Sequence, residues 1–176
     1  MNTRLFLRAS MSMAIMSVAL AAHAIAVNIV SVGSYTEDPN NSDLITQDES
    51  VLYSSLSDLP VPGSMLHVDG MLNPYVFTAT YSSANGDLVL DFMYENTVVG
   101  GIGVSTDSGI WSYKSGTGSF ANLSGGGSYS INYNGLANNY SSTSIVGNVE
   151  AVPEPASMVA LGAGALALLR RRKNDR

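Results

Sequence analysis

Few residues of this 176-residue chain have side chains suited to acid–base chemistry. Asp87 and Asp91 stand four residues apart across a predicted turn and strand, so their carboxyl groups could converge to cleave a glycosidic bond. His67 is the one imidazole outside the first 26 residues, which excludes a histidine cluster for zinc. Asp87 directly follows Asn85-Gly86, and turns recruit Asp for backbone reasons. We therefore expect no catalytic residues, and we keep a hydrolase or cyclase built on Asp87, Asp91 and His67 as an alternative.

A second group of chemically competent side chains lies between residues 37 and 43. Carboxylate and amide oxygens are the ligands that calcium prefers, and a calcium site need not follow the EF-hand spacing. The same composition is typical of a solvated acidic loop. We favour that interpretation and expect no metal and no cofactor. The candidate calcium ligands are Glu37, Asp38, Asn40, Asn41 and Asp43.

Four aromatic residues could form a surface on which sugar rings stack, because an aromatic ring combines an apolar body with a polar tip. Aromatic residues that alternate along strands usually face the core instead. Binding of a glycan or small ligand is therefore an alternative function. The four residues are Trp111, Tyr113, Tyr129 and Tyr133.

The elements that position these groups are predicted to be strands. From Asn73 onward, short alternating or β-branched runs are separated by Gly, Asn, Asp and Ser, a pattern typical of a sandwich or barrel. The runs 75–81 and 88–94 flank Asn85-Gly86, a pair that favours a tight hairpin. We expect an all-β fold, an antiparallel sandwich or small barrel of seven or eight strands.

The first part of the body is less regular. Residues 27–35 read as a strand. Thr46 to Glu49 has the form of a capping box, which predicts a short helix over 48–56. The prolines and glycines of residues 57–74 predict a long loop.

The segment Ser115 to Tyr129 reads Ser-Gly-Thr-Gly-Ser-Phe-Ala-Asn-Leu-Ser-Gly-Gly-Gly-Ser-Tyr. It resembles the glycine-rich hairpin of small lipocalin-like β-barrels, such as the dirigent and allene oxide cyclase group. The resemblance favours a barrel over a sandwich and implies no particular ligand or activity.

Residues 1–26 have the three parts of a secretory signal peptide. Arg4 and Arg8 precede the apolar run 11–20, and small residues then end in Ala24 and Ala26. We expect signal peptidase to cut after Ala24 or Ala26, which leaves residues 27–150 as a β-rich extracytoplasmic domain.

Residues 151–176 have a different composition. The uncharged run 156–169 would extend only ~21 Å as a helix, so it is a marginal transmembrane span. Arg170, Arg171, Arg172 and Lys173 follow it. Such a basic cluster holds residues 170–176 in the cytoplasm, and its long side chains can reach the headgroups.

Val152, Pro153, Glu154 and Pro155 precede this run. Pro-Glu-Pro, an apolar segment and an arginine cluster, in this order, resemble the PEP-CTERM sorting signal of Gram-negative bacteria. The resemblance implies an inner-membrane-anchored precursor that an exosortase-like peptidase processes for the cell surface, the medium or the exopolysaccharide matrix. The prolines keep the backbone extended, as a peptidase requires.

The net charge of the chain between its two ends limits the kinds of partner that it can bind. From Val27 to Pro155 there are thirteen Asp and Glu against one lysine, Lys114, a formal charge of −12. Binding of nucleic acid needs Lys and Arg to displace counterions, so we exclude it. The chain has no cysteine, hence no disulfide or thiolate chemistry. We expect an exported surface or matrix protein without catalytic activity.

Overall fold

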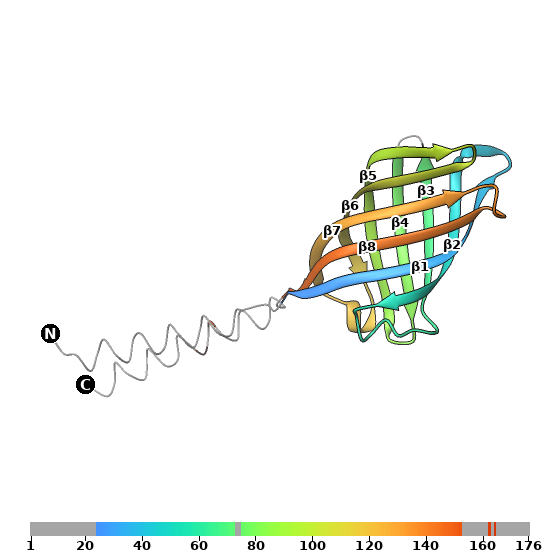
Figure 1. The fold of residues 1–176 in the computed structure, drawn as a ribbon. Helices are drawn as coiled ribbons and strands as arrows, with labels where there is room; N and C mark the ends of the chain where they lie inside the picture. Colours follow the sequence, from blue (N-terminus) through green and yellow to red (C-terminus); the bar gives the residue numbers. More distant parts are fainter. Residues whose placement is uncertain (1–23, 73–74, 153–161, 163, 165–176) are drawn as a thin grey trace, which may run out of the picture.

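The computed structural model describes residues 24–72 and 75–152, together with Gly162 and Gly164. Between residues 24 and 152 the described chain forms eight strands and one short 3-10 helix (Figure 1). The elements are β1 (Ile25–Asp38), β2 (Asn41–Ser54), β3 (Met65–Leu72), β4 (Tyr75–Ser83), β5 (Gly86–Gly101), β6 (Val104–Gly116), η1 (Gly118–Phe120), β7 (Leu123–Asn134) and β8 (Tyr140–Ala151).

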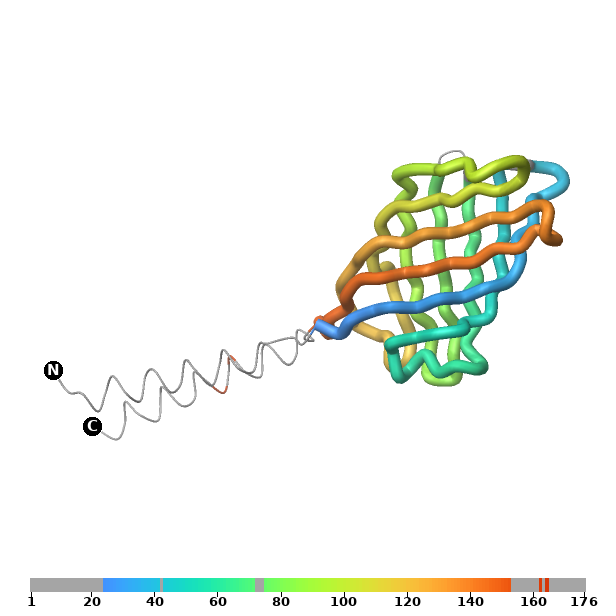
Figure 2. Tube along the Cα trace, in the orientation of Figure 1, coloured from blue at the N-terminus to red at the C-terminus, as the bar shows by residue number. Residues whose placement is uncertain are grey.

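The eight strands close into one barrel. Each strand pairs antiparallel with the next along the chain, and β8 returns to pair with β1 over ten residue pairs. Figure 2 shows these two strands, the blue β1 and the orange-red β8, side by side. Closure satisfies the backbone groups that an open sheet would expose at its edges. The prediction of an all-β antiparallel fold is confirmed, and the structure is the barrel rather than the sandwich.

The barrel interior follows from the alternation of residues along each strand, which sends successive side chains to opposite faces. On β1, for example, Val27 and Ile29 are buried, whereas Asn28 between them is exposed. Trp111 fills the interior and donates from Nε1 to the carbonyl oxygen of Val146 at 3.0 Å. The largest fully buried apolar or aromatic side chains are Tyr81, Phe77, Ile29, Leu59, Leu66, Leu88, Leu90, Ile131 and Ile145.

The hairpin predicted around Asn85-Gly86 is confirmed, because β4 and β5 pair from Ser83–Gly86 to Val76–Met93. Gly86 has φ +130°, in the region that favours glycine. A Cβ there would also come within 2.2 Å of the carbonyl oxygen of Thr117. The turn therefore needs glycine at this position for both conformation and space.

Two local predictions for the first part of the body are wrong. The segment expected as a helix over 48–56 is mostly the second half of β2, and the loop expected over 57–74 contains β3. Both segments form strands because each pairs with neighbours on both sides: β2 with β1 and β3, and β3 with β2 and β4. Leu56 and Leu59, between these strands, are buried, so the connection packs onto the barrel.

The predicted signal and transmembrane helices lie largely outside the described residues. Residues 1–23 are not described, and of the run 156–169 only Gly162 and Gly164 are, both in helical conformation. None of the described helices is long and apolar enough to cross a membrane.

Candidate functional sites

The sorting segment begins where the barrel ends. Ala151, the last residue of β8, pairs with Leu123 on β7. The backbone N–H of Val152 then donates to the carbonyl oxygen of Asn122 at 2.8 Å. Among the described residues, Val152 is thus the last residue of the sorting motif that the barrel holds. Pro153, Glu154, Pro155 and the basic cluster 170–173 lie outside the described residues.

The two predicted signal-cleavage positions differ in their surroundings. Ala24 precedes β1 and is exposed. Ala26 lies inside β1, pairs with Asn148 on β8, and accepts a hydrogen bond on its carbonyl oxygen from Ser55 Oγ at 2.9 Å. The start of β1 and the end of β8 therefore lie at the same end of the barrel (Figure 1).

The three residues of the hydrolase alternative lie on the outer wall, on two strands that are not adjacent. His67 is on β3, whereas Asp87 and Asp91 are on β5, and β4 lies between these strands. Four residues of strand separate Asp87 from Asp91 by about 13 Å, more than the roughly 5–9.5 Å between the paired carboxyl groups of glycosidases. The backbone N–H of Asp87 donates to Thr117 Oγ1, and the carbonyl oxygen of Asp87 accepts from the backbone N–H of Thr117, both at 2.9 Å.

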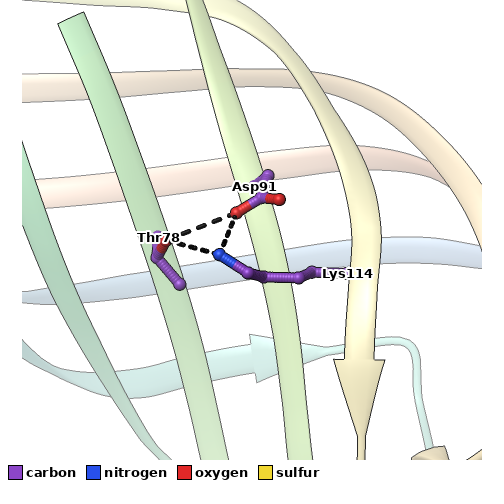
Figure 3. A network of polar contacts seen from close by, with 3 residues as sticks. All are labelled: Thr78, Asp91 and Lys114. Atoms are coloured by element: carbon purple, nitrogen blue, oxygen red, sulfur yellow. Dashed lines mark hydrogen bonds and ion pairs between the residues drawn. The ribbon is translucent and has the colours of Figure 1, made fainter.

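Asp91 takes part in an ion pair. Lys114 Nζ lies 2.8 Å from Asp91 Oδ1 and 3.2 Å from Thr78 Oγ1, and the Thr78 hydroxyl donates to Asp91 at 3.3 Å (Figure 3). The three residues come from adjacent strands β4, β5 and β6. This network occupies the carboxylate with a cation rather than leaving it free to act as an acid or base.

His67 stands between two carboxylates. Its Nδ1 lies 2.7 Å from Asp48 Oδ1, and its Nε2 lies 3.3 Å from Asp69 Oδ2. The hydrogen bond with Asp48 is the main cause that raises the pKa of His67, and the charges of both aspartates act in the same direction against the effect of burial. The arrangement favours the imidazolium form.

The candidate calcium ligands surround the β1–β2 turn. Asp38 Oδ1 accepts a hydrogen bond from the backbone N–H of Asn40 at 2.7 Å, and Asn41 Oδ1 accepts one from that of Asp43 at 3.1 Å. Both contacts are local turn contacts. Among the described residues, no group of three or more His, Cys, Asp or Glu side chains could hold a metal ion.

An open hollow of about 570 Å³ lies beside this turn, against β2, β3 and β4. Its wall carries three carboxylates together with apolar and threonine side chains, so the hollow is acidic and repels anions. The lining residues that set this character are Glu37, Asp38, Asp69, Leu44, Met71 and Val76.

Of the four aromatic residues considered for sugar stacking, three are buried: Trp111, Tyr129 and Tyr133. The ring of Tyr129 stacks on that of Phe92 with centroids 4.3 Å apart. Tyr113 is partly buried and donates its hydroxyl to the carbonyl oxygen of Phe120 at 2.9 Å. These side chains fill and brace the barrel and do not form an outer aromatic surface.

The inside of the barrel contains a polar network that the sequence reasoning missed. Glu49 and Gln47 are both fully buried, and Gln47 Nε2 donates to Glu49 Oε1 at 2.6 Å and to Thr143 Oγ1 at 2.7 Å. Ser31 Oγ donates to Glu49 Oε2 at 2.5 Å. The sequence signal was the alternation Ile45, Gln47, Glu49, Val51, which places the two polar residues on the inward face of a strand.

A second acidic group lies inside the same barrel. Asp107 is 7% exposed and accepts a short hydrogen bond from the Thr97 hydroxyl, which in turn accepts one from Tyr94 at 2.9 Å. Burial raises the pKa of Asp107, and the bond from Thr97 acts against that rise. The interior is therefore acidic at two places.

Comparison with known proteins concerns the segment after the barrel. The family model of the PEP-CTERM protein-sorting motif matches residues 151–173. The searches of curated proteins and of solved structures gave no match. The motif implies an exported, membrane-anchored precursor that exosortase-like machinery sorts to the cell surface. From the last residue of β8 onward, this chain carries a PEP-CTERM protein-sorting motif.

Proposed function

We propose that this chain is a non-enzymatic exported protein whose barrel is released at the cell surface or into the exopolysaccharide matrix after its sorting segment is removed. The observation that carries the proposal is the position of the PEP-CTERM motif. It starts at residue 151, where β8 ends, so all eight strands precede the segment that the sorting peptidase recognises. Removal of that segment leaves the barrel complete.

The outer wall supports a role without catalysis. Asp91 is paired with Lys114, His67 is held between two aspartates, and the backbone of Asp87 is bonded to Thr117. General acid–base catalysis needs groups that converge within hydrogen-bond reach of one reacting atom. His67 lies on β3, two strands away from Asp87 and Asp91 on β5, and the side chains of His67 and Asp91 are paired with their neighbours.

For the signal peptide, the pairing of β1 with β8 favours cleavage after Ala24. Cleavage there gives an N-terminal ammonium on Ile25, which is 49% exposed. Cleavage after Ala26 would place that ammonium on Val27, whose backbone lies within the paired part of β1 and whose side chain faces the core. It would also remove Ile25 and Ala26 from their pairing with β8.

For the sorting segment, we place the second cleavage beyond Val152. The backbone N–H of Val152 is bonded to Asn122, so this residue belongs to the closed barrel. Proline disfavours helix for itself and for the residue before it. The amino-acid types at 153–155 therefore favour this segment, between the barrel and the apolar run, as the one that the peptidase recognises.

The test is intact-mass analysis of the product in two matched hosts, one with an exosortase-like peptidase and one without it. With the peptidase, the surface or medium fraction should contain a chain that begins at Ile25 and lacks the basic cluster 170–173. Without it, the chain should stay in the membrane fraction and keep Arg176. Glu154→Ala, and replacement of the cluster by glutamine, should each reduce release.

Glu150→Gln is the matched control, because Glu150 lies on β8 just before the matched motif. It should be released like the unchanged chain. A full-length product in the cytoplasm, or an extracellular product that keeps Arg176, would contradict the proposed sorting. An N-terminus at Val27 would contradict only the assignment of the first cleavage.

A further inference from the structure

The outer wall of the barrel carries a continuous row of exposed apolar side chains across β3, β4, β5 and β6. Residues that pair across adjacent antiparallel strands point to the same face, with Cβ atoms about 4.5–5.5 Å apart. Met71 pairs with Val76, and Val76 pairs in turn with Met93. Met93 then pairs with Ile110. We call these four residues the apolar belt, and their side chains are between 41% and 63% exposed.

The apolar belt begins in the open hollow beside the β1–β2 turn. Met71 and Val76 line this hollow of about 570 Å³, together with the partly buried Leu44, which pairs with Met71. Strands are spaced about 4.8 Å apart, so the belt runs on from the hollow for ~14 Å across the wall. A partner can therefore place one apolar side chain in the hollow and others along the belt.

The wall beyond the belt has a different character. The same register continues from Ile110 to Ser128 on β7, to Val146 on β8 and to Asn28 on β1. Val146 is the one apolar residue among these three. The exposed apolar residues of this row are thus gathered on one side of the barrel, and a gathered apolar surface marks an interaction site more often than scattered residues do.

A row of polar side chains follows the belt two residues further along the strands. In this row Asp69 pairs with Thr78, and Thr78 pairs with Asp91. Both carboxylates already have a cation beside them, since His67 lies next to Asp69 and Lys114 next to Asp91 (Figure 3). This border of the belt is therefore polar and close to neutral.

Three other carboxylates lie near the belt. Glu37 and Asp38 line the hollow, and the exposed Glu95 follows Met93 by two residues on β5. Among the described residues, none of the three takes part in an ion pair. The hollow and the adjoining edge of the belt thus combine apolar side chains with negative charge that has no cation beside it.

This combination selects among partners. A second copy, an anionic lipid surface and a nucleic acid are all repelled by a barrel of formal charge −12. A wholly apolar partner would remove the carboxylates from water without pairing them, which is costly. A small molecule would stay largely in water on so open a surface, whereas ligands of true pockets are mostly buried.

A protein segment with both apolar and basic side chains meets these conditions. Its apolar side chains would cover the belt, and its Lys or Arg side chains would reach Glu37, Asp38 and Glu95. Methionine adapts its shape to what it contacts, and apolar grooves commonly receive one face of an amphipathic helix. We propose that the hollow and the apolar belt bind a basic amphipathic helix of another protein.

The experiment titrates the full chain into labelled peptides and follows fluorescence anisotropy. The probe is a leucine–lysine peptide of about 18 residues whose leucines recur at i, i+3, i+4 and i+7, which gives one apolar helix face. It should bind in a saturable manner, and more weakly in about 1 M salt. A peptide with glutamate for lysine should not bind. A peptide of the same composition with scattered leucines should bind at least about tenfold more weakly.

Two double variants test the apolar contact. Val76→Thr with Met93→Thr removes the centre of the belt and should weaken binding by at least about tenfold. Leu52→Thr with Val146→Thr is the matched control, because these residues are 56% and 46% exposed but lie outside the belt. Threonine suits strands, so both variants should fold, which circular dichroism checks. The control should bind as the unchanged chain does.

Two further double variants test the charge. Glu37→Gln with Asp38→Asn should weaken binding a few-fold and reduce its dependence on salt. Asp58→Asn with Glu150→Gln removes the same charge at the other end of the barrel, between β2 and β3 and at the end of β8. This control should leave binding unchanged.

The inference is wrong if the basic peptide does not bind, or if either control weakens binding as much as its partner variant. Light scattering gives a further test. A dimer of the unchanged chain that Val76→Thr with Met93→Thr dissociates would show that a second copy covers the belt. Replacement of the basic cluster 170–173 by glutamine should not affect binding. Binding that appears only after this replacement would show that the chain's own tail covers the belt, which also contradicts the proposal.

Discussion

The Nδ1 atom of His67 lies 2.7 Å from Oδ1 of Asp48 on the neighbouring strand β2. Asp69 approaches the other ring nitrogen, Nε2, to 3.3 Å. An imidazole that faces acceptors through both nitrogens satisfies both contacts only when it carries two protons. Because this surface histidine is better protonated in the folded protein than in the unfolded chain, it couples stability to pH.

The first prediction concerns that coupling. The pKa of folded His67 is raised above its ordinary value of 6.5, so its contribution to stability is complete below that value and is lost as pH rises through the raised pKa. Urea denaturation of the unchanged chain and of His67→Gln, from about pH 5 to about pH 8.5, measures the effect. The advantage of the unchanged chain should shrink as pH rises. A pH-independent difference would contradict the assignment.

The second prediction concerns the ion pair of Lys114 and Asp91 (Figure 3). Both side chains are close to half exposed, and exposed pairs contribute about 0.2–1 kcal/mol. Lys114→Gln should therefore lower the free energy of unfolding by less than about 1 kcal/mol. The difference should fall further in about 1 M salt, where the Debye length is about 3 Å. A loss above about 2 kcal/mol would show that Lys114 has a larger structural role than its exposure indicates.

The third prediction concerns the glycine that faces the single tryptophan. A Cβ at Gly147 would lie 2.6 Å from Trp111 Cζ2 and 2.3 Å from the carbonyl oxygen of Gly126. Gly147→Ala should cost about 1–3 kcal/mol through overpacking and shift the emission of Trp111. Gly100→Ala is the control, because its nearest contact would be an ordinary 3.5 Å to Val104. Equal effects of the two changes would contradict the packing argument.

The fourth prediction concerns where the barrel ends. A chain of residues 25–152 contains all eight strands, so it should unfold in one cooperative urea transition with the same Trp111 emission as the full chain. A chain that stops at Gly147 loses Val149, which is 2% exposed and pairs with Ile25 and Gly125. It should be less stable by more than about 2 kcal/mol, since burial of a valine contributes about 1.5–3 kcal/mol. Equal stability would show that the end of β8 is dispensable.

Features with local signals could be predicted from the sequence. The hairpin around Asn85-Gly86 depends on two alternating runs and the turn between them, all within about twenty residues. The sorting motif is likewise a local pattern of prolines, an apolar run and arginines, and the family model recognises it at residues 151–173. Such features need no knowledge of distant contacts.

The buried polar network of Ser31, Gln47, Glu49 and Thr143 could not be predicted in this way. Gln47 and Glu49 break the hydrophobic alternation of β2, although both side chains face the interior of the barrel. The segment Thr46 to Glu49 instead has the form of a capping box, which is typical of the first turn of a helix. The partner that stabilises Gln47 is Thr143, 96 residues away along the chain. Likewise β3 alternates buried Leu66 and Val68 with exposed His67 and Asp69. Its glycine, Gly70, and the prolines on either side of it are typical of a loop, which is why the sequence predicted one there. In both cases pairing with neighbouring strands overrides the local signal.

The pairing of β1 with β8 also decides when this protein can fold. The first strand finds one of its two neighbours only after about 115 further residues have been made, and long-range pairing of this kind is slow. Until then the barrel stays open between β1 and β8, although the pairs of strands that follow one another along the chain need no such wait. Closure of the barrel therefore depends on the stretch of chain immediately ahead of the sorting signal.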